Sequence, residues 1–110
     1  MLLVCCFEFA EAKKVFGYTD ETCARWTQER LKDKAQPNSF GAGFTAWGMQ
    51  QWSLGIVSGI NVYSDEKDFL VGLDAEAIWR WLDQHCSANP QVNFGNTVFE
   101  LIEALQQRAQ

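Results

Sequence analysis

The chain has 110 residues, 47% of them hydrophobic, a length that allows one domain with one core. Its formal net charge is −5 and its nine Lys and Arg residues are scattered, which argues against nucleic acid and anionic membrane surfaces as partners, because both attract clustered basic residues. No apolar run approaches the roughly 20 residues that a membrane-spanning helix needs.

The first twelve residues differ in character from the rest. An apolar run over residues 2–7 is followed by Ala10-Glu11-Ala12, which has the small-x-small form of a signal-peptidase site. We interpret residues 1–12 as the end of a secretion signal that starts further upstream, and residues 13–110 as a single helical domain. The alternative is an N-terminal strand or helix of a cytosolic protein with four free thiols. Secretion would leave Cys23 and Cys86 as the only cysteines, an even number that fits an oxidising compartment.

Helical periodicity indicates two helices in the first half of the domain. Thr19 or Asp20 can cap the first, which ends near Pro37. Its stripe at helical spacing comprises Cys23, Trp26, Arg30 and Leu31. The second helix is expected over about residues 45–63, with an apolar stripe made of Met49, Trp52, Ile56, Ile60 and Tyr63.

Two more helices are expected in the second half. Asp74 can cap the third, and Asn89 ends it because a residue before proline resists helical geometry. Its core stripe is Ala75, Ile78, Leu82 and Cys86, and that of the fourth helix is Val98, Leu101, Ile102 and Leu105. The fourth helix starts between Val92 and Thr97, where Thr97 and Glu100 have capping-box spacing. With no convincing strand alternation, the sequence predicts an all-α, compact four-helix domain.

Glycines are unusually frequent in the second helix, at Gly48, Gly55 and Gly59. Each costs roughly 0.5–1 kcal/mol relative to Ala in a helix interior. We expect close packing of another helix against Gly55 and Gly59 to compensate for this cost. A membrane dimer motif would have the same spacing, but Gln50 and Gln51 argue against it.

Cys23 and Cys86 fall on the predicted core stripes of the first and third helices. We therefore expect a disulfide between these helices, which would lower the entropy of the unfolded chain by roughly 4 kcal/mol in the chain-entropy model. The alternative is two buried free cysteines that behave as small hydrophobic residues.

The connection over residues 64–73 is the predicted partner-binding loop. It combines charges that could steer a partner with apolar side chains that could anchor it: Asp65, Glu66, Asp68, Phe69 and Leu70. The alternative is that Phe69 and Leu70 cap the bundle while the charged side chains face water.

We expect no enzymatic activity, no cofactor and no metal. The single histidine, His85, adjoins Cys86, and neighbours on a helix point about 100° apart, so these two side chains cannot form a catalytic dyad. A zinc site would need more ligands than one histidine and one cysteine pair supply.

Several short stretches resemble a known group of proteins. They are Cys23 to Trp26, Trp52 to Asn61, Asp74 to Cys86, and the Asn89-Pro90 turn. In these features, over about residues 19–107, the chain resembles small bacterial periplasmic proteins that include the type VI secretion amidase immunity proteins of the Rap/Tai group. It also resembles, more distantly, the HdeA-type acid-stress chaperones. The resemblance implies an HdeA-like helical fold with an inter-helix disulfide and a periplasmic or secreted location.

Three functions are compatible with this resemblance. The first is a protein-binding domain without catalysis, in the form of an immunity protein that inhibits an amidase toxin. The second is an acid-activated periplasmic chaperone, and the third is an accessory periplasmic protein without an assigned role. The partner would be a protein, either a toxin or a client. Five tryptophans, with Tyr18 and Tyr63, are also compatible with a homodimer.

Overall fold

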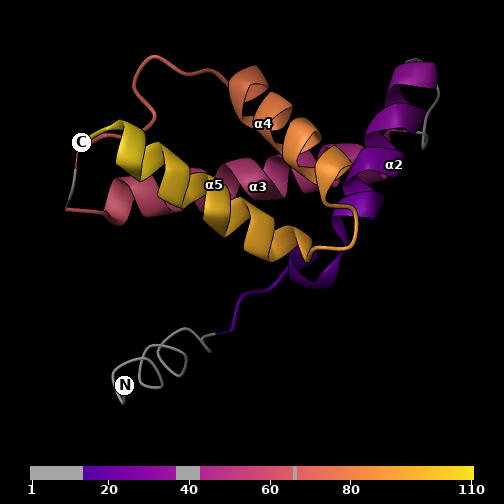
Figure 1. The fold of residues 1–110 in the computed structure, drawn as a ribbon, viewed down its shortest axis with the longest axis horizontal. Helices are drawn as coiled ribbons and strands as arrows, with labels where there is room; N and C mark the ends of the chain where they lie inside the picture. The colour runs from indigo at the N-terminus through magenta and orange to yellow at the C-terminus, as the bar shows by residue number, and fades with distance from the viewer. Residues whose placement is uncertain (1–13, 37–42, 66) are drawn as a thin grey trace.

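The computed structural model describes residues 14–36, 43–65 and 67–110 (Figure 1). A short 3-10 turn, η1 (Tyr18–Asp20), precedes four α-helices: α2 (Cys23–Ala35), α3 (Phe44–Tyr63), α4 (Ala75–Ala88) and α5 (Phe94–Arg108). The predicted all-α class and the predicted number of helices are therefore confirmed. Within these ranges, the only pairing of β type is an isolated bridge between Thr22 and Asn93.

The helix starts follow short polar side chains. The Thr22 hydroxyl accepts a hydrogen bond from the Arg25 amide, so α2 is capped by Thr22 and not by Thr19 or Asp20, which lie in η1. Asp74 caps α4 as predicted. Asn93 caps α5, so Thr97 lies inside the first turns of that helix and not at its end.

In Figure 1, α5 crosses in front of α3, while α2 lies at one end of both. Each helix contributes to one buried cluster: Cys23, Trp26, Met49, Val57, Phe69, Ile78, Leu82, Cys86, Phe94, Val98, Leu101, Ile102 and Leu105. At its centre, the fully buried Trp26 stacks on Phe94, with ring centroids 5.2 Å apart and planes at 18°. Trp26 thereby joins α2 to α5.

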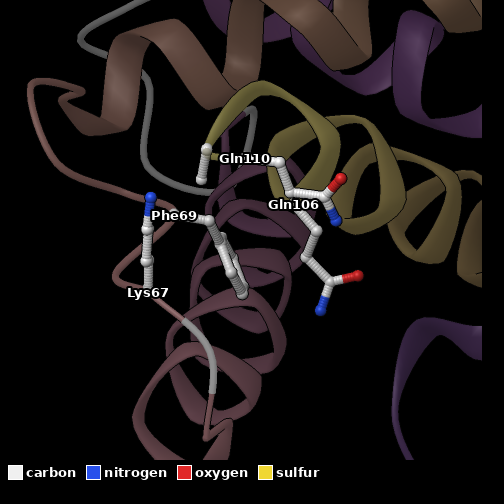
Figure 2. Close-up of a pocket in the computed structure, with 5 residues that line it drawn as sticks. Lys67, Phe69, Gln106 and Gln110 are labelled. Atoms are coloured by element: carbon white, nitrogen blue, oxygen red, sulfur yellow. The ribbon is translucent and has the colours of Figure 1, made fainter.

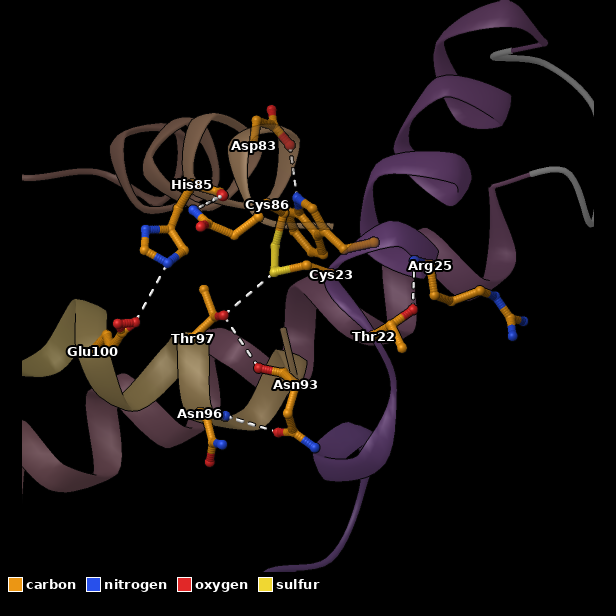
Figure 3. The surroundings of a disulfide bond; sticks show 12 residues. Thr22, Cys23, Arg25, Asp83, His85, Cys86, Asn93, Asn96, Thr97 and Glu100 are labelled. Carbon is orange, nitrogen blue, oxygen red and sulfur yellow. Dashed lines mark hydrogen bonds and ion pairs between the residues drawn. A yellow bond between two sulfur atoms is a disulfide. The ribbon is translucent and has the colours of Figure 1, made fainter. Parts of the chain in front are cut away.

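The disulfide between Cys23 and Cys86 links the start of α2 to the end of α4 (Figure 3). The two Cα atoms are 4.7 Å apart, and both residues are fully buried. The Thr97 hydroxyl lies 3.3 Å from Cys23 Sγ and donates to the Asn93 carbonyl, so α5 contacts the same position. The predicted inter-helix disulfide is therefore present, and it lies within the core.

Close packing at Gly55 and Gly59 was expected, and this prediction is wrong. A Cβ atom added at either position would meet nothing within 4 Å, because the two glycines lie on the side of α3 that faces away from the bundle. Close approach occurs instead at Gly48, where a Cβ would collide with the Tyr18 hydroxyl, and at Gly95, where it would meet the Thr19 backbone carbonyl at 2.9 Å.

Candidate functional site

Hydrogen bonds give the predicted binding loop a defined shape. Asp68 Oδ1 accepts from the Asn61 side chain at 2.8 Å and from the Leu70 amide at 2.9 Å, and Asn61 Oδ1 accepts from the Phe69 amide at 2.9 Å. From α5, the Arg108 guanidinium donates to the carbonyls of Phe69 and Val71. The loop is thus fixed to the ends of both α3 and α5.

The loop directs its largest side chain inward. Phe69 is 1% exposed and belongs to the core cluster, and Leu70 is half-buried against it. The prediction that Phe69 anchors a partner is therefore corrected, because the ring can reach a partner only by leaving the core. Asp65 and Asp68 are exposed, and Glu66 lies outside the described residues. The hydrogen bond from the Leu70 amide, followed by that from Asn61, lowers the pKa of Asp68.

A cavity of about 590 Å³ lies between this loop and the end of α5 (Figure 2). Its lining comprises Lys67, Phe69, Gln106, Ala109 and Gln110. The polar ends of these side chains are one ammonium and two carboxamides, which can hydrogen-bond a polar group. The cavity can therefore hold part of a ligand.

Ion pairs gather several charged side chains on α2, where Glu29 contacts both Arg25 and Lys32 in the described part of the chain. No three His, Cys, Asp or Glu residues there are close enough to hold a metal ion together. His85 stacks on Trp81 with ring centroids 4.7 Å apart, and its Nε2 lies 3.4 Å from a carboxylate oxygen of Glu100. This arrangement links α4 to α5, as Figure 3 shows for His85 and Glu100.

A second surface, which the sequence analysis did not identify, runs along α3. We call it the α3 outer face and define it by six residues at helical spacing that are exposed: Phe44, Trp47, Gln51, Gly55, Ser58 and Val62. Phe44 is 64% exposed and Trp47 59%, with their ring centroids 6.5 Å apart. The chain has no Asp, Glu, Lys, Arg or His between Lys34 and Asp65, so the face carries no charge.

Aromatic side chains without neighbouring charges are characteristic of protein interfaces, since charged residues are depleted there and aromatic ones enriched. The α3 outer face has this composition, and the rest of the described surface carries the charges. No described helix combines the length and apolar character needed to cross a membrane. The signal in the sequence was the uncharged interval itself, together with Phe44 and Trp47 outside the expected core stripe.

Comparison with known proteins gives no relative for this chain. It matches no protein-family model, and no curated protein or solved structure is significantly similar to it.

Proposed function

We propose that the protein is a non-catalytic protein-binding domain of the bacterial periplasm or of another oxidising compartment. The observation that carries this proposal is the α3 outer face, where Phe44 and Trp47 are exposed on a helix without charges. A partner that covers these rings would remove them from water, and this burial of apolar surface would favour binding. The buried disulfide supports the compartment, because disulfides persist where the environment is oxidising.

The specific role that we propose is inhibition of a toxin, as in the amidase immunity proteins that the sequence resembles. The α3 outer face would provide the apolar contact, and the exposed carboxylates of Asp65 and Asp68 beyond the end of α3 would steer the partner. Phe69 would hold the loop in place from within the core and would not touch the toxin.

Site-specific photo-crosslinking in cells tests the proposed surface. A photoreactive amino acid replaces Trp47 in one variant and Glu103, an exposed residue of α5, in the control. We expect position 47 to crosslink a discrete protein that mass spectrometry identifies, and position 103 not to. Equal crosslinking at both positions, or none at 47, would contradict the proposal. If the captured protein is an amidase, its inhibition by the purified domain tests the immunity role directly.

A chaperone function is the second candidate, and the same exposed rings favour it because unfolded clients bind apolar surface. The two candidates differ in selectivity. A chaperone would suppress aggregation of several unrelated clients, most strongly in acid, whereas an immunity protein would crosslink one partner at neutral pH.

A further inference from the structure

We infer that the α3 outer face also binds a second copy of this chain, with the two α3 helices antiparallel about a two-fold axis that crosses the outer face at the level of residue 53. This inference rests on the proposed function, because both require that the α3 outer face binds protein. The partner that the inference names is a second copy of this chain. It follows from the order of side chains along α3, from the room above its glycines, from the area of the exposed rings and from the distribution of charge.

The order of side chains makes the face complementary to itself. Its large residues, Phe44 and Trp47, lie at the start of α3, and its small ones lie in the second half. The midpoint of the stripe is residue 53. An antiparallel copy centred there brings Phe44 opposite the apolar side chain of Val62 and Trp47 opposite Gly59.

The glycines provide the necessary room. A Cβ at Gly55 or Gly59 would meet nothing within 4 Å, so the backbone of α3 is open to an approaching helix over this turn. Small residues at a helix interface allow two backbones to approach closely, and bulky rings from the facing helix fill the space above them. This arrangement accounts for two glycines in a helix interior, which packing within one copy does not explain.

The exposed rings supply about half of the area that a stable dimer buries. Phe44, Trp47 and the adjoining Tyr63 are 64%, 59% and 89% exposed. Covering three such rings in both copies removes roughly 600–1,000 Å² from water. That is about half of the roughly 1,200–2,000 Å² buried in stable, specific interfaces, before the other residues of the face are counted.

Charge favours this face over any other for contact between two copies. Each copy carries a formal charge of −5, so two copies repel each other over most of their surface. The interval between Lys34 and Asp65 is uncharged, so the middle of this face brings no carboxylates of the two copies together.

Sedimentation velocity tests this inference on the full chain, with Cys5→Ser and Cys6→Ser introduced to prevent disulfides between copies. We expect a monomer–dimer equilibrium that shifts with concentration. Gly55→Glu should weaken the dimer because it buries two carboxylates near the axis. The dissociation constant should rise at least about 30-fold, which is the effect of losing a central interface residue. Gln107→Glu, an equal change of charge at an exposed position of α5, should leave the equilibrium unchanged.

A charge-swap pair makes the test specific to this geometry. Gly55→Arg should also be monomeric, and mixing it with Gly55→Glu should restore a dimer, because position 55 lies close to its own counterpart across an axis at the level of residue 53. Circular dichroism controls for folding, and both variants should be at least as helical as the parent since nothing meets their Cβ atoms.

A chain that stays monomeric at every concentration, or variants that dimerise like the parent, would overturn the inference. If the chain is monomeric while position 47 still crosslinks a different protein, the dimer fails and the proposed function stands. If position 47 crosslinks only a second copy of this chain, and Gly55→Glu abolishes both that crosslink and the dimer, the proposed function fails and the dimer stands.

Discussion

The Arg30 guanidinium binds both carboxylate oxygens of Asp83, with Nε 3.0 Å from Oδ1 and Nη2 2.8 Å from Oδ2. The same Oδ1 accepts from the Trp26 indole at 2.8 Å, and the Gln50 amide, oriented with its oxygen toward α2, accepts from Arg30 Nη1 at 2.9 Å. The guanidinium also lies over the Trp26 and Trp79 rings. This cluster joins α2, α3 and α4 at the edge of the core.

The hydrogen bond to Asp83 raises the pKa of Arg30, against burial, which lowers it. A raised pKa contributes stability that is present below the unfolded-state pKa of Arg30 and is lost only as the pH rises through the still higher folded-state pKa.

Asp83→Ala should lower the free energy of unfolding by about 2 kcal/mol. It leaves the Arg30 guanidinium and the Trp26 indole without their acceptor, and partial exposure of the pair moderates the cost. Urea denaturation followed by circular dichroism measures the change, with Glu103→Ala as the exposed control. A loss below about 0.5 kcal/mol, the range of ordinary surface changes, would show that the cluster contributes little.

Reduction of the Cys23–Cys86 disulfide should destabilise the domain by about 4 kcal/mol, because the bond closes a loop with a sequence separation of 63. Urea denaturation with and without a phosphine reductant measures the difference while both sulfur atoms stay in place. A Cys23→Ala/Cys86→Ala variant should show no effect of the reductant. An equal response of this variant would assign the effect to something other than the disulfide.

The buried faces of α4 and α5 were predictable because each helix has a single apolar face. The predicted stripe of α2 is right at Cys23 and Trp26 but wrong at Leu31, which is 60% exposed. The Ile78, Leu82 and Cys86 stripe of α4 is buried as predicted, and Asp74 caps the helix. The disulfide followed from the same periodicity, because it placed Cys86 on a core face. The start of α2 was less predictable, since Thr19, Asp20 and Thr22 all have side chains that can cap.

The buried side of α3 was predictable only in part, because this helix has no charged residue to mark its solvent side. Four residues of the predicted stripe face the core, since Met49 is buried and Trp52, Ile56 and Ile60 pack against it, whereas Tyr63 is 89% exposed. The buried side also includes Gln50 and Ser53, whose polarity pattern analysis assigns to the surface. Gln50 is buried because it meets Arg30, and Ser53 because it donates to the Gln50 carbonyl at 2.8 Å. Such contacts between distant elements leave no trace in local periodicity.

The shape of the predicted binding loop also depends on contacts that local sequence patterns do not reveal. The charged start of the 64–73 loop suggested a protruding binding element, but the Asn61 and Arg108 hydrogen bonds draw the loop onto the bundle and turn Phe69 inward. Neither residue is close to Phe69 in sequence. The exposure of Phe44 and Trp47 was not predictable either, because aromatic residues on an apolar helix are most often buried.

Phe69→Ala should destabilise the domain by about 3–5 kcal/mol, the usual cost of removing a buried phenylalanine ring. Val71→Ala, at a 65% exposed position in the same loop, should change the stability by less than about 0.5 kcal/mol. Chemical denaturation compares the two variants. If Phe69→Ala instead left stability unchanged and abolished partner binding, the ring would be a surface anchor after all.

Two glycine-to-alanine substitutions should change the stability of the domain in opposite directions. Gly55→Ala should stabilise the monomer by about 0.5–1 kcal/mol, because alanine favours the helix and its Cβ meets nothing within 4 Å. Gly95→Ala should destabilise it, because the Cβ would lie 2.9 Å from the Thr19 backbone carbonyl, which belongs to η1 and cannot move alone. Thermal unfolding at a concentration where the chain is monomeric measures both, and equal signs would contradict the packing described for α5 and η1.

Acid should weaken the loop through Asp68. Its lowered pKa means that Asp68 contributes stability above the ordinary value of 3.8, and this contribution is lost as the pH falls through the lower folded-state value. Asp68→Asn should therefore reduce the difference in stability between neutral pH and pH values below 3.8, whereas Glu103→Gln, at an exposed position of α5, should preserve it. NMR titration of the Asp68 carboxyl measures the pKa directly. A value at or above 3.8 would show that the Leu70 and Asn61 hydrogen bonds do not favour the ionised form, and acid would then have to open the domain elsewhere.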